Sequence, residues 1–200
     1  MRDLGRALAV RGHSVLKINL CPGDALFWRG HDTLTFRAKR KDWPDFLRQV
    51  LKERNATDIV YFADRFPYHR LAQDVARDFG VRQVSLEYGY LRPDWLILEE
   101  GGQSTFSHFP NANEAIRAAA KSLPEVDMTP KFAIPEFTEA ICETSFHLSN
   151  VFLAPFFTPN YAPDRYYSVL REYLSYAPRV VRRALNAKRA DTRVSALQDS

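Results

Sequence analysis

Charged and aromatic side chains gather around one glycine in the segment 85–102, SLEYGYLRPDWLILEEGG. Arg92 can hold a phosphate or a carboxylate through two parallel hydrogen bonds, and Tyr90 and Trp95 can offer ring faces to a sugar or a base. These residue types suit glycosyl chemistry. The same segment contributes Glu87, Gly89 and Asp94 to the candidate site. A structural interpretation stays open, in which the aromatic rings are core residues and Arg92 pairs with Asp94 or Glu99.

A second polar cluster follows the apolar run DIVYF, in the sequence ADRFPYHR. It enters the first turn of a predicted helix, where backbone N–H groups and the helix dipole favour an anion. His69 can carry a proton near neutral pH, or it is a hydrogen-bonded structural group. The candidate residues of this cluster are Asp64, Arg65, Tyr68, His69 and Arg70.

Apolar periodicity divides the first ninety residues into alternating helices and short strands. Helices are predicted from Leu4, over Trp43–Arg54 and from Pro67 to Gly80, and strands over 15–20, 33–36, 58–64 and 81–86. This alternation predicts an α/β fold, with a Rossmann-like parallel sheet and helices on both faces. Ligands bind at the carboxyl ends of such strands, so the two polar clusters are expected to share one anion-accepting hollow.

The pattern changes after Gly102. Helices are predicted over 112–122 and 135–148, but residues 150–167 place three prolines among six aromatics, which predicts a break in regular structure. We therefore expect a Rossmann-like domain over 1–150 and a linker with a basic amphipathic helical tail over 151–200. The basic residues of the tail helix are Arg179, Arg182, Arg183, Lys188 and Arg189.

The composition excludes a disordered chain, since 46% of the residues are hydrophobic and 13% are aromatic. No apolar run reaches the roughly 18 to 20 residues of a membrane helix, and the first residues are charged, so a cytoplasmic location is predicted. Cys21 and Cys142 have no metal-ligand spacing and are predicted to be buried free thiols. A net charge of +4 permits an anionic partner without requiring nucleic acid, and no glycine-rich nucleotide fingerprint is present.

Three runs resemble the capsule polysaccharide biosynthesis/export family of Gram-negative bacteria, in particular its KpsS/LipB-type members. They are GHSVLKINLCPGDALFW, DRFPYHRLAQDVAR and EYGYLRPDWLILEEGG, and the resemblance covers about Gly12 to Pro110. It implies a retaining, GT-B-like glycosyltransferase with two Rossmann-like domains. Such an enzyme moves 3-deoxy-manno-octulosonic acid (Kdo) from CMP-Kdo to a lysophospholipid at the cytoplasmic face of the inner membrane. The donor is a sugar nucleotide, and no separate cofactor is implied.

Carried onto this sequence, the resemblance makes Glu87 the carboxylate for an oxocarbenium-like centre, with Asp64 in reserve and His69 or Glu87 as general base. It assigns substrate binding to Arg65, Tyr68, Arg70, Gly89, Tyr90, Arg92, Asp94 and Trp95. The family usually has two acidic residues before the glycine, and here the second is Tyr88. Either Glu87 takes the catalytic role, or the tyrosine does, or the activity is altered.

The lipid acceptor implies contact with an anionic membrane, which the basic tail helix could make peripherally, or that helix is simply solvated. Family members are longer and have a second Rossmann-like half, so this chain is expected to be a fragment that lacks the second domain. The glycine-rich opening that the resemblance implies before RDLGRALAVRGH is missing, so the fragment is also expected to be truncated at its N-terminus. The competing hypothesis is a non-catalytic remnant or scaffold that binds another capsule transferase or the exporter.

Overall fold

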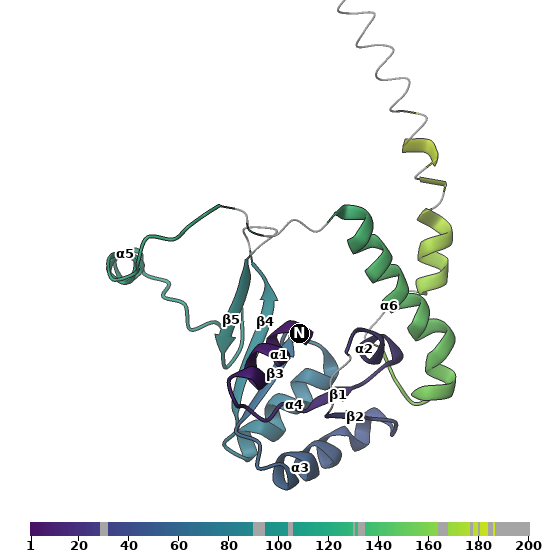
Figure 1. Cartoon of the computed structure of the whole chain (residues 1–200), viewed down its shortest axis with the longest axis horizontal. Coiled ribbons are helices and arrows are strands. Elements are labelled where there is room, and N and C mark those ends of the chain that lie inside the picture. Colours follow the sequence, from purple (N-terminus) through teal and green to yellow (C-terminus); the bar gives the residue numbers. More distant parts are fainter. Residues whose placement is uncertain are drawn as a thin grey trace, which may run out of the picture. The chain divides into compact units, whose positions relative to one another are not determined.

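The computed structural model describes residues 1–28, 32–89, 95–103, 106–129, 131, 135–163, 168–176, 178–179, 181–183 and 186. The chain divides into two compact units, Met1–Ala162 and Pro163–Ser200. The first unit carries the helices and strands labelled in Figure 1. In chain order these are α1 (Arg2–Val10), β1 (Lys17–Asn19), α2 (Pro22–Phe27), β2 (Thr33–Thr35), a 3₁₀ turn (Arg40–Asp42), α3 (Trp43–Glu53), β3 (Asp58–Phe62), α4 (Pro67–Asp78), β4 (Arg82–Tyr88), β5 (Leu96–Glu100), α5 (Asn113–Lys121) and α6 (Glu136–Phe157).

The strands form a parallel pair and a three-stranded sheet of order β3-β4-β5. β1 pairs with β2 in parallel, and β3 pairs with β4 in parallel, with Tyr61 opposite Ser85. β4 and β5 are antiparallel, with Glu87 opposite Ile97. The prediction of a mixed α/β architecture with parallel strands is therefore confirmed. The parallel sheet predicted from the sequence does not extend to β5, which pairs with β4 in the antiparallel sense. Only five residues separate Gly89 from Trp95 in the sequence, fewer than the dozen or so that a crossover between parallel strands needs.

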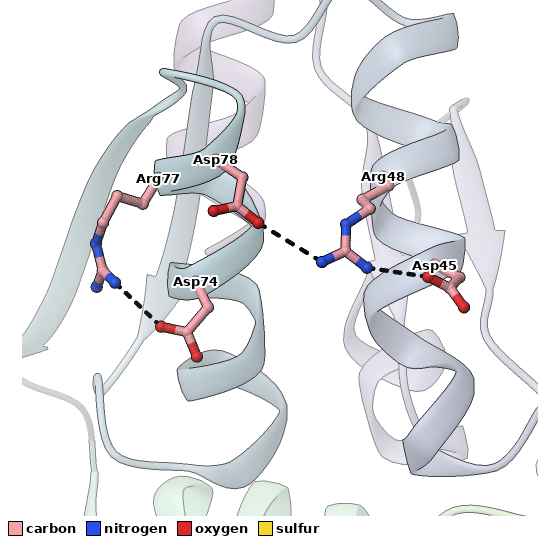
Figure 2. A network of polar contacts seen from close by, with 5 residues as sticks. All are labelled: Asp45, Arg48, Asp74, Arg77 and Asp78. Carbon is pink, nitrogen blue, oxygen red and sulfur yellow. Dashed lines mark hydrogen bonds and ion pairs between the residues drawn. The ribbon is translucent and has the colours of Figure 1, made fainter.

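Helices α3 and α4 form most of the hydrophobic core. Their buried side chains include Leu47 and Val75, each 1% exposed, and Ala76, which is fully buried. On their outer side, Arg48 of α3 pairs with Asp45 of its own helix and with Asp78 of α4 (Figure 2). The 3.6-residue periodicity of the sequence predicted these two helices, and their bounds agree with the prediction to within two residues.

Helix α6 extends further than predicted. It continues past Leu148 to Phe157 and contains Pro155 in its last turn, where a missing N–H costs only one helical hydrogen bond. The predicted domain boundary at residue 150 lies inside this helix. α6 packs on α2, where the Gly23 N–H donates to Asn150 Oδ1 over 2.7 Å.

The thiol prediction is correct for one cysteine only. Cys21 is buried at 2% exposure, whereas Cys142 is exposed on α6. The sequence placed Cys142 within a predicted helix, but it could not reveal which face of that helix packs against α2.

In the second unit, residues 169–176, 178–179 and 181–183 are helical. Arg179, Arg182 and Arg183 are exposed on this helix, and Lys188 and Arg189 lie outside the described residues. In the described part of the chain, no helix combines the length and the apolar character needed to cross a bilayer.

Candidate functional site

The carboxyl ends of β3 and β4 lie next to each other. The Ala63 N–H donates to the Leu86 carbonyl over 2.7 Å, which extends the pairing one residue beyond β3. Ala63 has φ 59°, a left-handed conformation that is uncommon for a residue other than glycine and that often marks a functional site. This sharp turn directs the next residue, Asp64, into the protein.

Asp64 is only 6% exposed and is held by contacts from three segments of the chain. Its Oδ2 accepts a hydrogen bond of 2.9 Å from the Gln103 N–H, and its Oδ1 lies 3.5 Å from Arg65 Nε. Its main-chain carbonyl accepts a hydrogen bond of 2.6 Å from Gln73 of α4. A buried carboxylate with these partners has a fixed orientation, because each partner restricts it from a different direction.

Gln103 was not predicted as a site residue, although it links Asp64 to the sheet. It is 2% exposed, and its Nε2 donates 3.2 Å to the carbonyl of Ser85, which is fully buried in β4. Gly102 precedes it with φ 138°, and a Cβ there would lie 2.9 Å from Phe106 Cβ and 3.3 Å from Asp64 Oδ2. The sequence signal for this segment was the glycine pair after β5, since only glycine fits such a close approach.

Arg65 lies at the surface of the site. Its guanidinium carbon is 4.2 Å from the centre of the Phe106 ring, and its side chain is 52% exposed. Nε faces Asp64, and no other ion pair or hydrogen bond to this guanidinium comes from the described residues. Its Nη groups can therefore receive an anion such as a phosphate or a carboxylate.

His69 is held against the turn at Ala63. Its Nδ1 lies 2.8 Å from the Ala63 carbonyl, and a carbonyl only accepts, so Nδ1 carries the hydrogen and Nε2 bears the lone pair. The ring stacks on Tyr61 with centroids 5.2 Å apart. Burial lowers the pKa of His69 below its ordinary value, so the neutral form is favoured and Nε2 can accept a proton.

Tyr68 and Arg70 occupy different environments. Tyr68 is 4% exposed, its carbonyl accepts from Trp43 Nε1, and its ring stacks on Tyr161. Its contacts are those of a core residue, so the predicted role in substrate binding gains no support from its placement. Arg70 is exposed on α4, and its side chain makes no hydrogen bond or ion pair within the described part of the chain.

The end of β4 places Glu87 and Tyr88 on opposite faces of the sheet, because successive side chains of a strand alternate. Glu87 is exposed and shares its face with Ser85, and the register puts Tyr61, the neighbour of His69, on that same face. Tyr88 packs edge-on against Phe62 at 5.1 Å on the other face. Glu87 is therefore the member of the pair that lies on the side of α4.

Gly89 closes the β4–β5 hairpin. Its N–H donates to the Trp95 carbonyl over 2.7 Å, and a Cβ at Gly89 would meet that same oxygen at 2.7 Å. The close approach of the two backbones therefore explains why position 89 is a glycine. Trp95 is half-buried where the hairpin ends. The other predicted residues of the segment 85–102, Tyr90, Arg92 and Asp94, lie outside the described residues.

The site therefore brings together Asp64, Arg65 and His69, with Glu87 on the adjacent strand end. Within the described part of the chain, Glu87 makes no hydrogen bond or ion pair with them, and no cluster of histidine, cysteine and carboxylate side chains is arranged to hold a metal ion. A groove of about 800 Å³ runs along β5 instead, lined by residues 97–101 and 108–110, and does not include these four side chains.

Comparison with known proteins places these residues in a family. The chain is 30% identical over 108 residues to the capsule polysaccharide export protein KpsS of Escherichia coli, covering 54% of this chain and 28% of that protein. It is 31% identical over 106 residues to the capsule polysaccharide modification protein LipB of Neisseria meningitidis serogroups A and B, covering 52% of this chain and 25% of LipB. The chain thus spans about a quarter of the length of the curated relatives it matches.

No solved structure matches the chain. The sequence model described as "Capsule polysaccharide biosynthesis protein" matches residues 57–200, a segment that begins just before β3 and contains Asp64, Arg65, His69 and Glu87. Because this match extends over well more than half of the sequence, the chain belongs to the capsule polysaccharide biosynthesis protein family.

Proposed function

We propose that this chain is a glycosyltransferase module of capsule assembly that transfers Kdo from CMP-Kdo to an anionic lysophospholipid. The observation that carries the proposal is the Asp64–Arg65 pair, with an accessible guanidinium beside a buried carboxylate at the carboxyl end of β3. This is the edge of a parallel α/β arrangement where ligands bind, and it lies within the segment that the family model matches.

The chemistry of the donor explains the need for these groups. The reacting carbon of CMP-Kdo carries a carboxylate, and its bond to a phosphate oxygen of CMP must break. Arg65 would neutralise the phosphate or the carboxylate, with Arg70 and Arg92 as further cations. In a retaining reaction, a carboxylate first bonds to the sugar carbon as CMP leaves, and the acceptor hydroxyl then displaces that carboxylate.

Glu87 suits the carboxylate role better than Asp64, because Glu87 is exposed whereas both oxygens of Asp64 face partners inside the protein. Asp64 would then orient Arg65. The Nε2 atom of His69 would accept the proton of the acceptor hydroxyl, since burial keeps the ring neutral.

The acceptor would be reached at the cytoplasmic face of the inner membrane. Arg179, Arg182 and Arg183 are exposed and belong to the helical residues of the second unit, which suits attraction to anionic headgroups. This attraction would be weakened by salt, because exposed charges are screened within about 10 Å at 0.1 M ionic strength.

The experiment that tests the proposal incubates the purified chain with CMP-Kdo and an acylated glycerophosphate, and detects the Kdo-lipid by mass spectrometry. Glu87→Gln and Asp64→Asn should each lower the rate about a hundredfold or more if the electrostatic roles are correct. Asp74→Asn is the matched control, because Asp74 is an exposed carboxylate of α4 that pairs with Arg77 (Figure 2). If Glu87→Gln and Asp64→Asn keep the wild-type rate, as Asp74→Asn is expected to do, Glu87 and Asp64 do not belong to the site.

A non-catalytic scaffold is the second candidate, and Tyr88 favours it, since the family resemblance leads us to expect an acidic residue at this position. A scaffold would form no Kdo-lipid but would co-purify with a full-length capsule transferase of the same cell. Product formed by the purified chain alone would exclude this candidate.

A further inference from the structure

We infer that a third chain segment completes the candidate site, with Phe106 as a positioning residue for Arg65 and Gln103 as a positioning residue for Asp64. The inference deepens the proposed function, because it concerns the same site. It depends, however, only on contacts that exist in the protein without any ligand.

Phe106 fixes the plane of the Arg65 guanidinium. An arginine side chain at a surface has many rotamers, and ordering it on binding an anion costs free energy. Here the guanidinium lies 4.2 Å above the Phe106 ring, while its Nε is drawn toward Asp64 at 3.5 Å. Two restraints in different directions leave the Nη edge facing outward before an anion arrives, which lowers the ordering cost of binding.

Gln103 fixes the carboxylate on which Arg65 depends. Its main-chain N–H bonds Asp64, and its side-chain amide bonds the Ser85 carbonyl of β4, so one residue joins the end of β3 to the neighbouring strand. At 2% exposure its side chain cannot exchange these partners for water. Displacement of Gln103 would therefore move Asp64 and, through it, Arg65.

The test measures how fast the Nε–H proton of Arg65 exchanges with water, by NMR of the ¹⁵N-labelled chain. Phe106→Ala should accelerate this exchange at least about fivefold, because the cation–π contact is lost. Phe106→Tyr keeps an aromatic face and should preserve the wild-type rate. Phe109→Ala is the matched control, since Phe109 is 68% exposed in the same segment and its ring contacts no other ring of the described residues.

Gln103→Leu should also accelerate the exchange, because the bond to Ser85 is lost. If Gln103→Leu does not fold, the exchange rates of the Phe106 variants alone test the inference. Equal exchange rates in the wild type and Phe106→Ala, or equal acceleration in Phe109→Ala, would overturn the inference. If exchange depends on Phe106 but the wild-type chain makes no Kdo-lipid, the positioning role stands and the proposed function fails.

Discussion

Replacement of Gly102 by alanine tests the closest packing in the candidate site. Gly102 has φ 138°, a conformation that costs a residue with a side chain about 1–3 kcal/mol. The added Cβ would also lie 2.9 Å from Phe106 Cβ and 3.3 Å from Asp64 Oδ2, an overpacking that costs a further 1–3 kcal/mol or so. The free energy of unfolding should fall by about 2–6 kcal/mol, and the Asp64 carboxylate should move away from Gln103.

Gly12→Ala separates the two contributions. Gly12 also has a positive φ, 88°, but nothing lies within 4 Å of a Cβ built there, so only the same backbone cost of about 1–3 kcal/mol is expected. The excess cost at Gly102 over Gly12 therefore measures the steric contact, and should be about 1–3 kcal/mol.

Urea denaturation followed by circular dichroism gives the free energy of unfolding of both variants. Native-state hydrogen exchange at the Gln103 amide reports the site directly, because that N–H is bonded to Asp64. We expect this amide to exchange at least about tenfold faster in Gly102→Ala than in Gly12→Ala at matched stability. Equal destabilisation by the two substitutions, with unchanged protection at Gln103, would refute the close packing around Asp64.

Three further outcomes are expected. Because the pKa of His69 is lowered in the fold, the unfolded chain binds a proton first as the pH falls below about 6.5. The free energy of unfolding should decrease from that pH down to the folded pKa, and His69→Gln should flatten this dependence in urea titrations. An unchanged pH dependence in this variant would contradict the buried, neutral ring. Burial raises the pKa of Cys21 to about 12, so native chain treated with iodoacetamide at pH 8 should be alkylated at Cys142 and not at Cys21, as peptide mass spectrometry would reveal. Leu47→Ala should lower the free energy of unfolding by about 2–5 kcal/mol, since its side chain is 1% exposed, and a loss below about 1 kcal/mol would contradict its place in the core.

Local patterns in the sequence were sufficient for the elements that carry the site. Apolar residues recur at helical spacing in Trp43–Glu53 and Pro67–Asp78, which predicted both helices. A proline at the start and a glycine after the end of the second helix also predicted its bounds. The strand Asp58–Phe62 is a short apolar run followed by polar residues, so the sequence placed Asp64 at the carboxyl end of a strand, although the predicted strand over 58–64 was two residues too long. These features depend only on residues within one turn or one strand.

Features that depend on distant residues could not be predicted in the same way. Leu96–Glu100 was not predicted as a strand, and its antiparallel pairing with β4 comes with a close approach of Gly89 to Trp95, which no local pattern reveals. Tyr68 follows the helix start and was predicted to bind substrate, yet it is buried, and its position relative to Trp43 contributes to that burial. Gln103 contacts Asp64 across 39 positions of sequence and has no motif of its own.

Side chains of β4 alternate between the two faces of the sheet, and this decides how Tyr88, which stands where the family resemblance leads us to expect an acidic residue, should be interpreted. The family resemblance places an acidic residue at position 88, and its absence could be taken as loss of the catalytic group. In this fold, however, position 88 faces Phe62, whereas position 87 faces the side of the sheet that holds Tyr61 and His69. A carboxylate that acts together with His69 must come from the face of Glu87, and that face retains its acidic residue. Tyr88 therefore does not by itself remove the side chains on which the proposed chemistry depends, and formation of the Kdo-lipid, rather than this position alone, separates the enzyme from the scaffold.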